Sequence, residues 1–169
     1  MKKFGMAMLM ALLVLLVTMF AIPLQANAAL VLADEGATQI LGTFLRSVTT
    51  GDVKLHLYCT NVTPNASGTD TVSTYTECTG GGYAAVTLTR GTNWTISGNA
   101  PTEAAYLEQT FTFTGALTTN TTIYGYYVTD SGSTVLIWSE LLGSTFVPAN
   151  NGDNVKITPK FQMSKGTPN

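Results

Sequence analysis

The residue types that most often carry catalytic chemistry are sparse in this chain of 169 residues, which has a single histidine, His56. His56 lies in the alternating stretch Val53–Tyr58, on the side opposite to the aliphatic residues and next to Lys54 and Tyr58. A Ser-His-acid triad would have to use this histidine, but the chain has no Gly-x-Ser-x-Gly sequence to hold a nucleophile. We therefore predict that His56 is a solvated residue on the outer face of a strand.

Carboxylate side chains are the other candidates for chemistry, because two of them can meet in a folded protein as a general acid and a general base, as in glycosidases. No spacing singles out one pair, so a carboxylate-pair hydrolase is a third hypothesis, and the leading prediction is that the protein is not an enzyme. The carboxylates are Asp34, Glu35, Asp52, Asp70, Glu77, Glu103, Glu108, Asp130, Glu140 and Asp153.

The sequence also gives no sign of a metal, a cofactor or a nucleic acid. Asp130-Ser131-Gly132 and Gly152-Asp153 lack the regularly spaced oxygen ligands of a calcium loop, and hairpin turns explain both. Once an export leader with its two lysines is removed, six basic side chains remain against ten acidic ones. Such a weakly acidic surface argues against nucleic acid as a partner. We predict no cofactor and no metal site.

Cys59 and Cys78 are the only cysteines. Export would bring them into an oxidising compartment, where a disulfide is the favoured interpretation and metal binding is the weaker one. The bond would close a loop of about 20 residues and stabilise the fold by about 3 kcal/mol. The stretch Cys59–Thr74 is rich in Thr, Asn, Ser, Pro and Gly, so we expect a long exposed loop that the disulfide holds.

Aromatic side chains are the best candidates for binding. Tyr124 and Tyr126 are expected to share one face of a strand, with Tyr127 on the other face and Trp94 elsewhere. An exposed aromatic row can stack on sugar rings or anchor a protein contact, because such rings bury much area at small entropic cost. Core packing is the alternative for all of them. Tyr124, Tyr126 and Trp94 are therefore our candidate contact residues.

These side chains must be positioned by strands, and one hairpin organises the rest. The arms Ile123–Val128 and Val135–Trp138 are filled with β-branched and aromatic residues and are joined by Asp130-Ser131-Gly132-Ser133. Both faces of each arm carry bulky groups. We therefore expect this hairpin in the middle of a sheet that is covered on both sides.

The N-terminal 28 residues have the layout of a signal peptide. Two lysines precede an uncharged apolar run from Phe4 to Ile22, and Ala26-Asn27-Ala28 supplies small residues for cleavage before Ala29. An uncleaved membrane anchor is the alternative, because the run approaches the about 20 residues that span a bilayer. Cleavage would leave residues 29–169 as a single domain without a stable membrane anchor.

The mature chain would begin with the apolar run Ala29, Leu30, Val31 and Leu32. We expect this N-terminal assembly segment to add as a strand to a neighbouring subunit. A short helix is then predicted from Glu35 to about Arg46, with Asp34 as its N-cap.

Further strands are predicted at Ala84–Thr89, Trp94–Ile96, Tyr106–Thr114 and Val155–Met163. Pro159 lies inside the last of these, which should therefore be an edge strand or contain a bulge. Seven or eight short strands joined by turns predict an all-β fold, specifically a two-sheet antiparallel sandwich, jelly-roll or Ig-like, with the one short N-terminal helix.

Five short motifs follow one another between Val31 and Met163. They are Leu55–Pro64 (LHLYCTNVTP), Gly82–Ala84 (GYA), Ile123–Thr129 (IYGYYVT), Ile137–Glu140 (IWSE) and Asn151–Pro159 (NGDNVKITP). In this order and spacing they resemble small virion-associated proteins of tailed bacteriophages. The resemblance implies a non-enzymatic, multicopy structural protein, such as a capsid decoration or fibre-like component, and it implies no catalytic residues.

The leading hypothesis is therefore an exported β-sandwich that assembles with copies of itself or on a larger capsid, filament or surface assembly. Its location would be extracellular or on the cell surface, or on the virion surface if the phage resemblance holds. The alternative hypothesis is a secreted carbohydrate-binding or adhesin module, in which a glycan is the partner.

Overall fold

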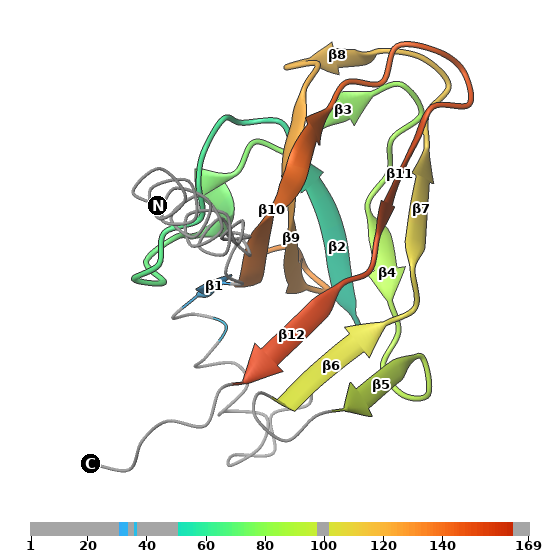
Figure 1. The fold of residues 1–169 in the computed structure, drawn as a ribbon. Helices are drawn as coiled ribbons and strands as arrows, with labels where there is room; N and C mark the ends of the chain where they lie inside the picture. Colours follow the sequence, from blue (N-terminus) through green and yellow to red (C-terminus); the bar gives the residue numbers. More distant parts are fainter. Residues whose placement is uncertain (1–30, 34–35, 37–50, 98–101, 164–169) are drawn as a thin grey trace, which may run out of the picture.

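The computed structural model describes residues 31–33, 36, 51–97 and 102–163 (Figure 1). Within these residues the chain forms twelve short β-strands and one turn of 3-10 helix, and every strand pair is antiparallel. The predicted all-β class is confirmed. The signal peptide at residues 1–28 lies outside the described residues, as does the helix predicted from Glu35 to Arg46 apart from Gly36.

The largest sheet has five strands in the order β1-β10-β9-β2-β4. Its two longest strands are the arms of the predicted hairpin, β9 (Ile123–Asp130) and β10 (Leu136–Phe146). On the far side of β9 lies β2 (Val53–Tyr58), followed by the short β4 (Val86–Leu88). At the other edge, β1 (Val31–Leu32) pairs with β10. β9 is thus inside the sheet, as the two-sided apolar pattern of the hairpin predicted, whereas the described residues cover the outer side of β10 only with the two residues of β1.

A second set of strands forms a two-stranded antiparallel ribbon that is interrupted halfway along. β6 (Thr102–Tyr106) pairs with β12 (Lys160–Met163), and β7 (Gln109–Thr112) pairs with β11 (Asn154–Ile157). The predicted strands Tyr106–Thr114 and Val155–Met163 are therefore each interrupted. Pro159 lies at the second interruption, where it has no N–H to donate to a ladder, and its carbonyl accepts the N–H of Tyr106 at 2.9 Å.

The remaining strands extend or cap this arrangement. β5 (Trp94–Ser97) pairs with β6 and completes a three-stranded sheet, and β3 (Thr79–Gly80) pairs with β8 (Leu117–Thr119). The short 3-10 turn, η1 (Val72–Thr74), lies in the segment between the two cysteines. The strands described here are thus distributed over four sheets, and the two-sheet sandwich remains a prediction.

Two separate clusters of buried side chains lie on the large sheet. We call the larger one the apolar core; it joins the large sheet to the ribbon and contains Leu55, Leu57, Leu88, Tyr106, Phe111, Phe113, Ile123, Tyr126, Val128, Ile137, Trp138 and Ile157, among others. We call the smaller one the tyrosine layer, formed by Ala33, Tyr58, Tyr75, Tyr127 and Leu136. Neighbouring residues alternate between the two clusters along Leu57–Tyr58 in β2 and Tyr126–Val128 in β9, as period-two strands require.

Candidate functional site

His56 is buried, and the prediction of a solvated surface histidine is wrong. Its side chain is 3% exposed, and its ring stacks on that of Tyr127 with the centroids 4.7 Å apart. The error has a physical cause: the outer face of β2 is covered by the segment between the two cysteines, which brings Tyr75 against the tyrosine layer. A strand pattern alone does not show that a loop will cover its polar face.

Both nitrogens of the His56 ring have partners. Nδ1 lies 2.9 Å from Oε1 of Glu77, and Nε2 lies 3.0 Å from Oγ1 of Thr129. The order hydroxyl, imidazole, carboxylate is that of a hydrolase triad. However, Thr129 is fully buried and its hydroxyl donates to the carbonyl of Asp130 at 2.9 Å, so it is neither accessible nor poised for attack. This cluster is a structural network.

Glu77 connects this network to the loop. Its Oε1 also accepts the hydroxyl of Tyr83 at 2.9 Å, and that hydroxyl in turn accepts the N–H of Leu57 at 2.9 Å. The hydrogen bond from His56 holds the pKa of Glu77 below its ordinary value, and the bond from Tyr83 acts in the same direction. The carboxylate is thus kept ionised by the groups around it.

The Cys59–Cys78 disulfide is formed, with the two Cα atoms 5.1 Å apart. Backbone hydrogen bonds reinforce it, since the N–H of Cys59 donates to Thr76 and the N–H of Cys78 donates to Leu57. In the loop so closed, the Tyr75 hydroxyl donates to Asp70 at 2.7 Å and lies 2.8 Å from the hydroxyl of Ser139. The disulfide therefore fixes the segment that covers the tyrosine layer.

The three candidate contact residues have different environments. Tyr126 is only 4% exposed, belongs to the apolar core and donates a hydrogen bond to Glu140; burial, followed by this carboxylate, raises its pKa. Tyr124 is half-buried and packs against the tyrosine layer, so it does not share a packing environment with Tyr126. Trp94 is also half-buried. Tyr126 offers no ring surface to a partner, whereas the other two retain some.

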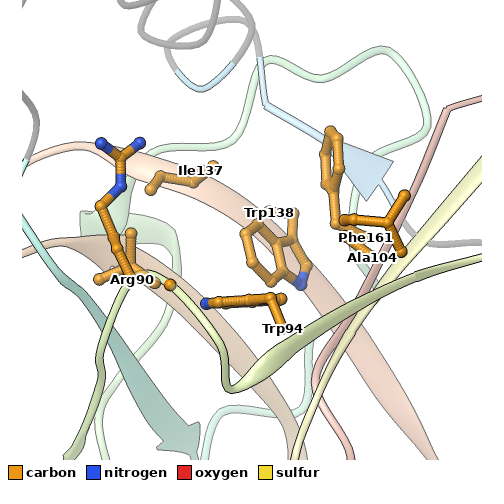
Figure 2. Close-up of a pocket in the computed structure, with 9 residues that line it drawn as sticks. Arg90, Trp94, Ala104, Ile137, Trp138 and Phe161 are labelled. Atoms are coloured by element: carbon orange, nitrogen blue, oxygen red, sulfur yellow. The ribbon is translucent and has the colours of Figure 1, made fainter.

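Trp94 lines an apolar pocket of about 390 Å³ between the large sheet and the ribbon. Figure 2 shows its indole beside that of Trp138, with Phe161 beyond and the Arg90 side chain on the opposite side. The ring centroids of Trp94 and Trp138 are 6.4 Å apart, and those of Trp138 and Phe161 are 5.4 Å apart. Such a lining suits an apolar group, because it supplies ring surface and few hydrogen-bonding partners.

Tyr124 lines a second pocket, of about 400 Å³ and very different chemistry. We call it the Tyr124 groove. It is formed where the chain leaves β2 and where it enters β9, by Cys59, Thr60, Asn61, Asn120, Thr121, Thr122 and Tyr124. The described residues that line it carry hydroxyls, side-chain amides and one phenol ring, and none of them is charged.

The outer edge of β10 is a third surface. β1 pairs there in the register Val31 to Ser139 and Leu32 to Trp138, and the N–H of Ala33 donates to Ile137 at 3.1 Å. Of the assembly segment, Ala29 and Leu30 lie outside the described residues. Among the residues described, β1 is the strand that pairs with this edge, so most of β10 beyond Ser139 presents unpaired backbone groups.

Among the described residues, no group of three or more His, Cys, Asp or Glu side chains is arranged to hold a metal ion. No helix in the same part of the chain is both long and apolar enough to cross a membrane.

Comparisons with family models, with curated proteins and with solved structures found no match to the chain. A proposal about function must therefore be based on the surfaces described above.

Proposed function

We propose that the protein is a non-enzymatic structural protein that, after export, assembles with its own copies or on a larger particle, filament or surface. In this proposal the strands form a two-layer sandwich, with the five-stranded sheet as one layer and the ribbon of β6, β7, β11 and β12 as the other. The disulfide is in keeping with an oxidising, extracellular location. The resemblance to phage virion proteins favours a virion surface, and the predicted export leader favours a cell surface or a filament.

The observation that carries this proposal is the mismatch between β1 and β10. Among the described residues, a strand of two residues occupies the edge of a strand of eleven. Gly143, Ser144 and Thr145 of β10 are exposed, and none of them is charged or a proline, which are the usual protections of an open edge. An edge of this kind accepts a strand from another chain through main-chain hydrogen bonds.

The register of β1 makes the proposal specific. Val31 lies opposite Ser139, so continuing the same register would put Ala29, the first residue of the cleaved chain, opposite Leu141. The edge of β10 from Leu142 to Phe146 would then extend past the mature N-terminus. A neighbouring subunit can use this edge in either of two ways, by exchanging β1 or by adding a strand beyond it.

Light scattering on the mature chain tests the assembly. We expect residues 29–169 to form a discrete multicopy particle, and we expect deletion of residues 29–32 to reduce it to monomers. A particle of unchanged size after the deletion would exclude the N-terminal segment as the connecting strand. A mature chain that remains monomeric at about 100 µM, a concentration at which weak contacts of about 5 kcal/mol are populated, would exclude self-assembly.

A crosslink distinguishes pairing within one chain from pairing between chains. Ala33 donates to Ile137, so Val31 and Ser139 also form a hydrogen-bonded pair, whose Cα atoms are typically about 5.5 Å apart and within reach of a disulfide. The double variant Val31→Cys/Ser139→Cys should give covalent multimers on a non-reducing gel if β1 is exchanged. Crosslinked monomers would show that β1 pairs within its own chain.

The alternative function is a secreted carbohydrate-binding or adhesin module. It is favoured by one observation, namely that Trp94 and Tyr124 are half-buried and each lines a surface pocket. A glycan array with the mature protein separates the alternatives, because assembly by itself predicts no sugar binding.

A further inference from the structure

The walls of the Tyr124 groove are held in place by neighbouring strands and by the disulfide. One wall follows β2 at Cys59, whose N–H donates to Thr76 at 2.9 Å, while the hydroxyl of Thr60 accepts the N–H of Thr76 at 2.7 Å. The other wall runs into β9, where Tyr124 packs against the tyrosine layer. The groove therefore exists before any ligand binds, and binding would not have to order it.

Unused hydrogen-bonding groups line this space. In the described part of the chain, the side-chain amides of Asn61 and Asn120 and the hydroxyls of Thr121 and Thr122 form no hydrogen bond. Each amide offers two donors and one acceptor oxygen, and each hydroxyl offers a donor and an acceptor. All four residues are uncharged, so they can pair with many neutral polar groups but offer no ion to a charged ligand.

The ring of Tyr124 adds a stacking surface to these hydrogen-bonding groups. A saccharide presents a face of C–H groups, which packs on an aromatic ring, and a rim of hydroxyls, which pair with amides and hydroxyls. The pocket at Trp94 has ring surface but few hydrogen-bonding groups, since it is lined mainly by apolar side chains. Tyr126 offers no accessible ring surface, because its ring is buried in the apolar core.

We propose that the Tyr124 groove is a binding site for a neutral saccharide. Tyr124 is the stacking ring, and Asn61 and Asn120 hydrogen-bond the sugar hydroxyls. This proposal rests on the carbohydrate-binding alternative and is independent of assembly through β10. Of the three candidate contact residues, Tyr124, Tyr126 and Trp94, the proposal assigns sugar stacking to Tyr124 alone.

Asn120 provides a clean variant for the test. Its φ of 50° lies in the left-handed region, which glycine adopts without strain. Asn120→Gly therefore removes the amide and preserves the backbone. Asn61→Ala does the same on the opposite wall, and Tyr124→Phe keeps the ring. None of these three changes removes a residue from the buried clusters.

The experiment is isothermal titration of the mature chain with maltohexaose, cellohexaose and tri-N-acetylchitotriose, each at up to about 10 mM, where even a millimolar Kd is measurable. We expect at least one sugar to bind, with affinity reduced about tenfold by Tyr124→Ala and about fivefold by Asn120→Gly or Asn61→Ala. Tyr124→Phe and Trp94→Ala should change the affinity by less than about twofold. Circular dichroism of every variant checks that it is folded.

Two results would overturn the proposal: no binding of any of the three sugars, or binding that Trp94→Ala abolishes and the groove variants leave unchanged. Light scattering on the same samples keeps the two functions apart. Protein that assembles but binds no sugar would refute the saccharide site alone, and monomeric protein that binds sugar would refute the assembly alone.

Discussion

The two faces of the five-stranded sheet are buried by different means. One face packs against the ribbon and Phe113 through aliphatic and aromatic side chains, which need only the exclusion of water. The other face is covered by a loop, and it buries His56, Thr129 and Ser139. Each of these polar residues has a hydrogen-bond partner. A disulfide-closed loop thus covers the second face, whereas a layer of strands covers the first.

This difference has an energetic consequence. The apolar core is tolerant, because aliphatic side chains of similar volume substitute for one another at moderate cost. The tyrosine layer depends on specific partners, since a buried polar group that loses its partner costs about 1 to 3 kcal/mol. The following variants test whether the stability of the second face depends on specific partners in this way.

The largest effect is expected from Gly125→Ala in β9. Gly125 pairs with Tyr58 on one side and Leu141 on the other, and a Cβ there would collide with the phenol of Tyr58 and the carbonyl of Glu140. Relieving a clash with backbone requires the strands to move, so we expect a loss of about 3 to 4 kcal/mol in the free energy of unfolding, measured in urea.

Gly143→Ala in β10 is the matched control for this variant. A Cβ at Gly143 would meet no atom within 4 Å, so we expect a change of no more than about 0.5 kcal/mol. Equal effects of the two substitutions would show that the tyrosine layer does not need the close approach at Gly125.

The next effect is expected from removing the disulfide in the double variant Cys59→Ala/Cys78→Ala. The chain-entropy model assigns about 3 kcal/mol to a loop of this length. If the loop alone covers the second face, hydrogen exchange should show loss of amide protection at Tyr75 and Thr76 before the amides of Leu55 and Val128 are affected. Uniform loss of protection across both faces would contradict the proposed division between them.

The disulfide is also one of the features that the sequence alone predicted correctly. Cys59 and Cys78 were paired correctly because two cysteines leave one choice, and the hairpin of β9 and β10 was correct because its residues and turn agree locally. The prediction that His56 is solvated was wrong because the burial of this residue depends on a loop folding back over the strand, which no local pattern encodes. Local signals identify strands, whereas contacts distant in sequence decide which faces are covered.

The same limit applies to the candidate contact residues. The alternation of Tyr124 and Tyr126 predicted a common face, but the register of β9 against β10 shifts between Gly125 and Ile123, and the two tyrosines pack against different clusters. Asn61 and Asn120 were not predicted as binding residues. They are 59 positions apart, and only the pairing of β2 with β9 brings them into one groove.

A smaller effect is expected from Tyr75→Phe. The change removes the hydroxyl that contacts Asp70 and Ser139 and leaves the buried Ser139 without this partner, so a loss of about 1 to 2 kcal/mol is expected in urea unfolding. Tyr127→Phe is the control, because the hydroxyl of Tyr127 forms no hydrogen bond among the described residues. A Tyr127→Phe loss as large as that of Tyr75→Phe would show that ring packing, and not the polar network, stabilises this face.

The smallest effect is expected from Glu77→Gln, and it should depend on pH. The bond from His56 lowers the pKa of Glu77 in the folded protein, so the carboxylate contributes stability above its unfolded pKa. That contribution is lost as the pH falls through the lowered, folded pKa. Because the Glu77 side chain is 39% exposed, solvent screening limits the contribution, and we expect a loss of about 0.5 to 1 kcal/mol at pH 7.

Urea unfolding of wild type and Glu77→Gln from about pH 7 to about pH 3 measures this effect. The two stability curves should converge on the acid side, where both proteins carry an uncharged group at position 77. Glu108→Gln is the control, since Glu108 pairs with Lys156 at 3.0 Å on the surface with both side chains more than half exposed, and exposed pairs contribute little. A gap between wild type and Glu77→Gln that stays constant to acid pH would mean that the charge of Glu77 does not stabilise the second face, and that its hydrogen bonds alone hold the loop.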